Sequence, residues 1–152
     1  MSTTPSTPPR RIVAAVDLTA ASHRVCHVAA EYARLLDAEI VLANVVHELA
    51  SLLGVYTAYT VNELQESLER EGGEKLRSLA REHFDPAHVP HRVVLLVGTP
   101  WAELLDLTMQ EDAVLLVMGT HSGSKPEHTF AGSCARRVVD NARCNVLLVP
   151  PE

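Results

Sequence analysis

Five short apolar runs, each about the length of one strand, recur along the chain with helix-like segments between them. The apolar runs occupy residues 11–16, 39–46, 93–97, 114–118 and 145–149, and the helix-like segments occupy residues 22–37, 62–84, 101–109 and 133–141. Strands that alternate with helices pair in parallel through right-handed crossovers. The order of these segments therefore predicts one α/β domain built on a parallel sheet.

Three local features refine this prediction. Ser22 is expected to be the N-cap of the first helix, because its hydroxyl can accept a hydrogen bond from a free backbone N–H group. Gly72 and Gly73 lie in the middle of the segment 62–84, where each glycine costs about 1 kcal/mol relative to alanine. We therefore expect a break or bend there. Residues 49–60 show no clean period, so a lid, a short helix and a partner-binding loop all remain open.

The composition fits a domain of this class. Hydrophobic residues make up 47% of the chain and aromatic residues only 4%, so the core must consist of Val, Leu, Ile and Ala. These residues are typical of buried parallel strands and the helices that cover them. The first nine residues are mainly Ser, Thr and Pro without an apolar pattern, which predicts a disordered tail at 1–9 and a folded domain at 10–152.

Charge, cysteines and histidines argue against several classes of function. The net charge is −6 with both signs interspersed, which argues against nucleic acid and anionic membranes as partners. No apolar run approaches the roughly 20 residues that span a bilayer. Three cysteines without paired spacing, and no secretory leader, predict a cytoplasmic protein. The eight histidines show no metal-ligand spacing, so no metal site is expected.

Polar and small residues follow two of the predicted strands. Asp17 and Thr19 come after the first strand, Gly119 follows the fourth, and Gly132 with Ser133 opens the last helix. Ligands of open α/β sheets bind beyond the carboxyl ends of the strands, and a helix N-terminus suits a phosphate. These pieces predict one anion-binding pocket.

Each piece also has a purely structural interpretation. Asp17 is equally compatible with a turn or cap, Gly119 with a tight turn, and Ser133 with a helix cap. Cys134 follows Ser133 at a helix N-terminus, where the helix dipole can lower the pKa of a thiol. A buried, inert cysteine is the expected outcome at that position.

The sequences VLLVMGTHSGS at 114–124, AGSCARRVV at 131–139 and NVLLVP at 145–150 resemble the universal stress protein family. The resemblance extends over nearly the whole chain from residue 11 to residue 150. It implies a five-stranded parallel sheet in the order 3-2-1-4-5 with helices on both faces. This is a Rossmann-like fold of the adenine nucleotide alpha hydrolase type.

The resemblance also implies a nucleotide site. ATP-binding members have a loop of pattern G-x2-G-x9-G-(S/T) around the phosphates and ribose, and residues that end the first two strands contact the adenosine. Ser122 stands where that pattern has its second glycine, and Gly123 follows one residue later. The residues expected to bind the cofactor are Ala15, Asp17, Thr19, Val45, Met118, Gly119, Ser122, Gly123, Gly132, Ser133 and Cys134.

Two functions follow from the resemblance. The first is a stress-response regulatory protein that binds ATP, AMP or ADP at the switch point of the sheet, with Mg²⁺ only if ATP is bound. The second is a family member that no longer binds nucleotide and acts as a protein-interaction module, motivated by Ser122 and by the unusual stretch 125–129. No nucleophile-elbow motif or pair of metal-binding carboxylates supports an enzyme, although slow ATP hydrolysis is compatible with the fold.

A homodimer is expected under either function. The implied strand order places residues 145–149 at a sheet edge, where their apolar side chains suit pairing with a second copy across a two-fold axis. A further protein partner is expected but not identified.

Overall fold

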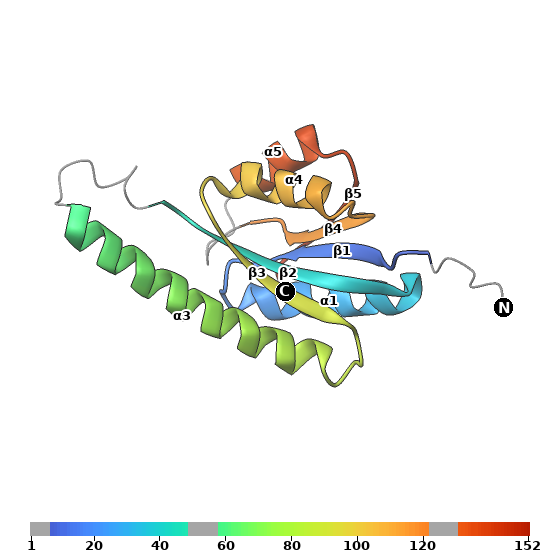
Figure 1. Cartoon of the computed structure of the whole chain (residues 1–152). Helices are drawn as coiled ribbons and strands as arrows, with labels where there is room; N and C mark the ends of the chain where they lie inside the picture. Colours follow the sequence, from blue (N-terminus) through green and yellow to red (C-terminus); the bar gives the residue numbers. More distant parts are fainter. Residues whose placement is uncertain (1–6, 49–57, 122–130) are drawn as a thin grey trace.

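The computed structural model describes residues 7–48, 58–121 and 131–152. Its centre is a parallel sheet of five strands in the order β3-β2-β1-β4-β5 (Figure 1). The predicted topology is therefore confirmed. The strands are β1 Arg10–Ala15, β2 Ala38–Val46, β3 His91–Val97, β4 Leu115–Gly119 and β5 Asn145–Val149.

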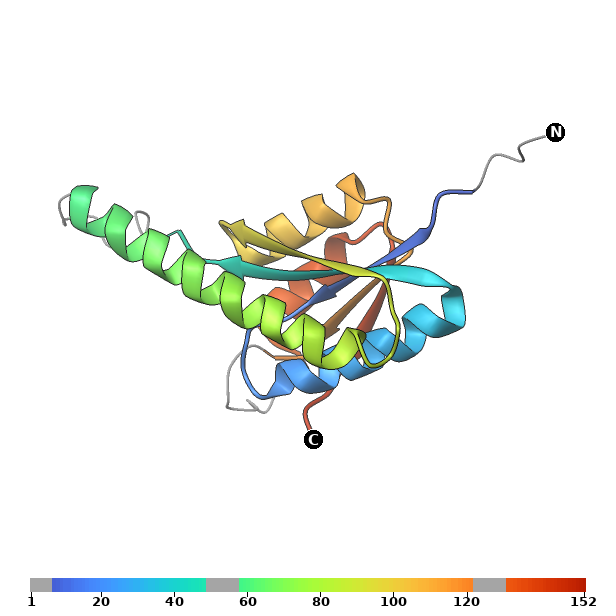
Figure 2. The same ribbon diagram turned by 60° about the horizontal axis from the view of Figure 1, so that its bottom comes forward.

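Among the described residues, four helices cover the sheet, two on each face. Helices α1 (Ala21–Leu36) and α3 (Ala58–Phe84) lie on one face, and α4 (Pro100–Gln110) and α5 (Ser133–Asn141) lie on the other (Figures 1 and 2). The expected three-layer arrangement is confirmed. Within the described ranges, no helix combines the length and the apolar character that a membrane crossing requires.

The two faces of β1 explain why its sequence is apolar at every position from Ile12 to Ala15. Ile12 and Ala14 belong to the core beneath α1 and α3, whereas Val13 and Ala15 belong to the core beneath α4 and α5. Successive side chains of a strand point to opposite faces, so a central strand needs apolar residues throughout. The first three of these side chains have no exposed surface.

Helix α3 corrects one prediction, because it continues without a break through Gly72 and Gly73. Both glycines are buried. A Cβ atom at Gly72 would lie 3.5 Å from Leu95 Cδ1 on β3 and 3.9 Å from Asn44 Oδ1 on β2. The glycine therefore lies where the helix approaches the sheet closely, and contacts with the sheet outweigh its low helix propensity. The N-terminal half of α3 extends beyond the sheet (Figures 1 and 2).

The start of α1 corrects a second prediction. The N-cap is Ala20, which makes no side-chain cap hydrogen bond, and Ser22 lies inside the first turn. The Ser22 hydroxyl is buried and donates a hydrogen bond to Asp17 Oδ1 at 3.2 Å. Ser22 therefore acts as a donor toward the preceding loop and does not accept from its own helix.

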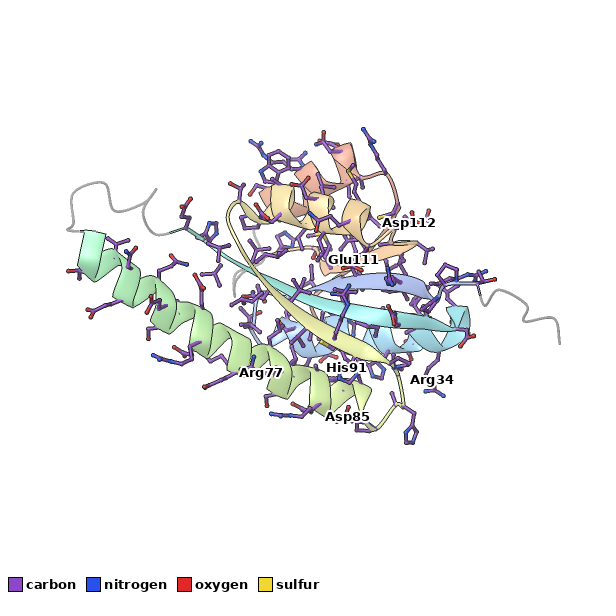
Figure 3. All side chains as sticks on the ribbon, viewed as in Figure 1. Arg34, Arg77, Asp85, His91, Glu111 and Asp112 are labelled. Carbon is purple, nitrogen blue, oxygen red and sulfur yellow. The ribbon has the colours of Figure 1, made fainter. Side chains whose placement is uncertain are left out.

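Ion pairs join the three strands β1, β2 and β3 near their amino ends. Arg11 Nε donates to Glu39 Oε1 at 2.7 Å, and Arg11 Nη1 lies 3.5 Å from Glu111 Oε2. Glu111, which follows α4 (Figure 3), also pairs with Arg92. These ion pairs thus lie at the edge of the sheet opposite the strand ends where a ligand is expected.

The environment of Gly72 predicts the effect of adding one methyl group. The change Gly72→Ala should raise the free energy of unfolding by about 0.5–1 kcal/mol, because the new Cβ meets ordinary contact distances and the helix gains propensity. Gly72→Leu should instead lower it, since the longer side chain would collide with Leu95 and Val46. Urea unfolding of both variants measures this, and destabilisation by alanine would contradict it.

Candidate functional site

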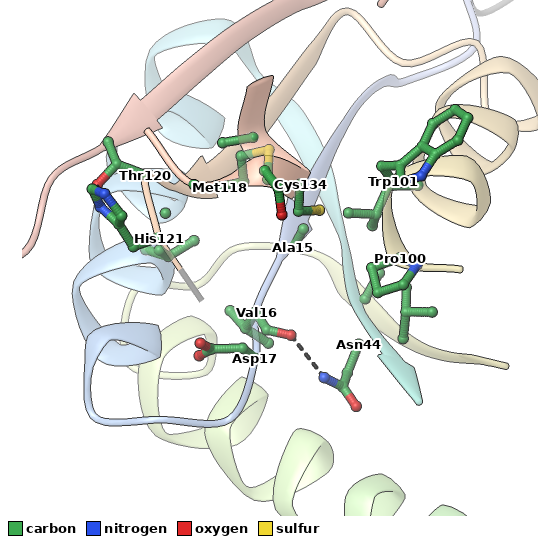
Figure 4. A pocket seen from close by; sticks show the side chains of 18 of the residues that line it. Ala15, Val16, Asp17, Asn44, Pro100, Trp101, Met118, Thr120, His121 and Cys134 are labelled. Atoms are coloured by element: carbon green, nitrogen blue, oxygen red, sulfur yellow. Dashed lines mark hydrogen bonds between the residues drawn. The ribbon is translucent and has the colours of Figure 1, made fainter. Parts of the chain in front are cut away.

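A cavity of about 640 Å³ opens at the carboxyl edge of the sheet, around the ends of β1 and β4. The strand order reverses here, because the chain leaves β1 toward β2 on one side and later returns to β4 on the other. Binding pockets of open α/β sheets form at such a point, and this volume lies in their ordinary range. The first turns of α4 and α5 complete the walls (Figure 4).

Most of the residues predicted for cofactor binding surround this one cavity. Thr19 lies outside its lining and borders a neighbouring hollow, while Ser122 and Gly123 lie outside the described residues. The predicted residues that line the cavity are Ala15, Asp17, Val45, Met118, Gly119, Gly132, Ser133 and Cys134.

Asp17 organises the loop between β1 and α1. Its Oδ1 accepts hydrogen bonds from the Thr19 N–H at 3.1 Å, the Thr19 hydroxyl at 2.6 Å and the Ser22 hydroxyl at 3.2 Å. Leu18, which lies between Asp17 and Thr19, has φ 62°, a left-handed conformation that is uncommon for a non-glycine residue. Asp17 therefore has the structural role of a turn residue, which the sequence allowed. The same hydrogen bonds fix its carboxylate at the cavity wall.

Asn44 joins the ends of β1 and β2 beneath the cavity. Its side-chain amide donates to the Val16 carbonyl at 2.8 Å, and the residue is only 8% exposed (Figure 4). Because a buried polar group needs a partner, this bond sets the relative position of the two strand ends. Its sequence signal was a polar residue inside an apolar run at the end of the second predicted strand, and Asn44 was not among the residues expected to bind the cofactor.

The first turn of α5 faces the cavity. Gly132 is the N-cap and carries no side-chain cap, while Ser133, Cys134 and Ala135 follow along the wall. Ser133 is thus the first helical residue rather than the cap. The Gly132 N–H donates to the Thr120 carbonyl at 2.7 Å, which joins α5 to the end of β4. The free N–H groups of such a helix start attract anions.

The lining residues that the sequence motifs did not predict include Trp101 on α4 and Arg137 on α5. The Arg137 guanidinium carbon lies 5.3 Å from the centre of the Trp101 ring, a cation–π contact. Figure 4 shows Trp101 and Pro100 across the cavity from Asp17 and His121. The cavity therefore has the Asp17 carboxylate on one side and the Arg137 guanidinium, stacked on Trp101, near the other. These residues come from different parts of the chain, so no single sequence motif contains both charges.

Burial raises the pKa of the Cys134 thiol and so opposes any lowering by the helix dipole. Cys26 is more deeply buried, and its pKa is raised to about 12. Cys144 is likewise raised by burial, and none of the three is in a disulfide. The protonated, inert form expected for Cys134 is the one that its surroundings favour.

Residues 9–150 match the model of a family described as the Universal stress protein family. The chain belongs to the universal stress protein family. A curated relative, "Universal stress protein MJ0531" from Methanocaldococcus jannaschii, is 32% identical over 137 residues, which cover 88% of this chain and 75% of the relative. The family resemblance seen in the sequence is thereby confirmed.

Solved structures share the fold at low sequence identity. The structure of hypothetical protein MJ0577 superposes with a TM-score of 0.82 at 20% identity, covering 96% of this chain and 99% of that one. A universal stress protein in complex with cAMP gives 0.60 at 20% identity, covering 95% and 98%. The universal stress protein from Archaeoglobus fulgidus in complex with dAMP gives 0.59 at 24% identity, covering 92% and 96%.

The hydrogen bonds of Asp17 predict a stability effect that separates it from other carboxylates. The change Asp17→Ala should lower the free energy of unfolding by about 1–3 kcal/mol, because two donors of Thr19 and the Ser22 hydroxyl at the start of α1 lose their acceptor. Asp106→Ala, on the exposed face of α4, should change it little. Urea unfolding compares the two, and equal stability would show that the Asp17 bonds do not hold the loop.

Proposed function

We propose that this chain is a stress-response regulatory protein that binds an adenine nucleotide in the cavity at the switch point of the sheet. The observation that carries the proposal is the meeting of three pieces around one cavity: the β1 end with Asp17, the β4 end with Gly119, and the start of α5. Family members with this fold have been solved with cAMP and with dAMP. Both ligands contain an adenine base and a phosphate.

The lining suits the two ends of such a ligand differently. Ala15, Val45 and Met118 offer small or apolar side chains for a flat base, and Asp17 offers an acceptor for the amino or hydroxyl groups of adenosine. The first turn of α5 offers backbone N–H groups to a phosphate, with Ser133 as an additional donor. The base therefore lies toward the strand ends and the phosphate toward α5.

The proposed activity is binding rather than catalysis. Among the described residues that line the cavity, Asp17 is the one carboxylate, and its Oδ1 is engaged in the β1–α1 loop. Phosphoryl transfer uses metal ions held by protein carboxylates or amides and a residue that orients the nucleophile. With ATP, Mg²⁺ would be held chiefly by the phosphates, and any hydrolysis would be slow.

The second candidate is a family member that has lost nucleotide binding and acts as an interaction module. Ser122 favours it, because a side chain occupies a glycine position of the ATP-binding pattern. Ser122 lies outside the described residues. Restoring glycine there should create or strengthen nucleotide binding if this account is right.

Calorimetric titration with ATP and magnesium, compared with ADP and AMP, tests the nucleotide proposal. We expect micromolar binding, and at least ten-fold weaker binding for Gly132→Val. A Cβ at Gly132 already meets the Thr120 carbonyl oxygen and His121 Cα at 3.5 Å, so the two methyl groups of valine would displace this turn. Val139→Ala, half-exposed on the same helix, is the matched control.

Absence of detectable binding by the unmodified protein, together with absence of co-purified nucleotide in its mass spectrum, would contradict the nucleotide proposal. Equal nucleotide affinity of the Gly132→Val and Val139→Ala variants would instead indicate that the phosphate does not bind at the start of α5.

We also propose that the protein forms a homodimer through β5, which ends the sheet beside β4. Its central residues Val146, Leu147 and Leu148 are only partly buried. An edge strand has one row of unpaired backbone groups, and pairing with a second copy across a two-fold axis would satisfy them.

The dimer proposal predicts that Leu148→Lys gives a monomer. A charged side chain at this edge disfavours its burial between two copies. Light scattering coupled to gel filtration gives the mass, and circular dichroism checks that the variant is folded. Val114→Lys, at another partly exposed apolar position, should leave the mass unchanged. A folded Leu148→Lys variant that remains dimeric would place the interface elsewhere.

A further inference from the structure

A second group of chemically active side chains lies where α1 packs against α3, outside the lining of the cavity. His23 comes from the first turns of α1, and Glu82 and His83 come from the last turn of α3. One nitrogen or oxygen atom of each residue lies within 4.8 Å of the other two. His23 and His83 are 60 positions apart in the chain, so no sequence spacing indicated this group.

The distances resemble those between ligands of one metal ion. His23 Nδ1 lies 2.9 Å from His83 Nε2 and 3.7 Å from Glu82 Oε1. Two ligand atoms about 2.0–2.1 Å from a tetrahedral zinc ion are roughly 3.3 Å apart. One observed separation is slightly shorter than this value and the other slightly longer. Small side-chain rotations would therefore bring both to the coordination distance.

The facing nitrogens are also in a suitable chemical state. Two neutral imidazoles joined by a hydrogen bond have one donor and one acceptor nitrogen between them. Moving the donor's proton to its other ring nitrogen would leave both facing nitrogens with free lone pairs. Metal ions bind the neutral imidazole.

The geometry points to a binding site for a borderline divalent transition metal ion, Zn²⁺ or a close chemical relative, at His23, Glu82 and His83. Two imidazoles and one carboxylate form a ligand set that zinc accepts, with a water in the fourth position. Because the ligands come from two helices, the bound ion would cross-link α1 to α3. Glu82 would offset part of the ion's charge.

The site would lie close to the cavity without sharing a ligand with it. His23 and His83 border a hollow that is also lined by Gly119, Thr120 and His121. These last three residues line the cavity as well. The proposed metal site and the proposed nucleotide site are therefore neighbours that separate mutations can distinguish.

Titration of the untagged, nucleotide-free protein with Zn²⁺ in the presence of a competing chelator tests this inference. We expect one ion per chain with micromolar affinity, and at least ten-fold weaker binding for His23→Ala and for His83→Ala. Co²⁺, used as a spectroscopic substitute, should give the visible absorption of a tetrahedral site in the unmodified protein and lose it in the His23→Ala and His83→Ala variants. Zn²⁺ should also raise the melting temperature of the unmodified protein.

Two variants serve as controls. His88→Asn changes an exposed histidine at φ 53°, a conformation that asparagine tolerates, and it should bind Zn²⁺ normally. Gly132→Val should also retain Zn²⁺, whatever its effect on nucleotide. Absence of saturable binding by the unmodified protein would overturn the inference. Equal binding by the His23→Ala, His83→Ala and His88→Asn variants, each shown to be folded by circular dichroism, would also overturn it.

Discussion

The burial of β1 on both faces, between β2 and β4, is the constraint on which the rest of the structure depends. A strand buried on both faces requires a layer of helices on each face of the sheet. The strand order reverses next to β1, because the chain first adds β2 along one edge of β1 and later adds β4 along its other edge. That reversal creates the cavity. The bonds of Asp17 and Asn44 then fix the strand ends around it. Fold and candidate site therefore have one physical origin.

The sequence predicted the architecture well because each buried parallel strand appears in the sequence as an uninterrupted apolar run of strand length. It predicted boundaries less well wherever a distant contact decides them. Gly72 is a weak helix former by itself, yet the packing of α3 against β2 and β3 lets the helix continue through it. Ser22 is a good cap by itself, yet Asp17 provides a better partner for its hydroxyl. Both errors came from applying propensity where tertiary structure prevailed.

The candidate site shows the same division. The pieces that one motif contains, such as Gly119, Gly132 and Ser133, were identified from their spacing and do line one cavity. Trp101 and Arg137 meet only because α4 and α5 cover the same face of the sheet. His23 and His83 meet only because α1 and α3 cover the other. Such pairs depend on the packing of helices far apart in the chain, which the period of a single helix does not reveal.

The length of α3 has a mechanical consequence. Its half before Gly72 extends past the sheet with Leu64 and Leu68 exposed, while the half after it is held by Leu76 and Phe84 in the core (Figure 1). The projecting half is about 20 Å long. A rigid rod of that length converts a tilt of about ten degrees in the anchored half into a displacement of about 3 Å at its tip. A tilt too small to disturb the core would therefore still move the N-terminal end of α3 by several ångströms.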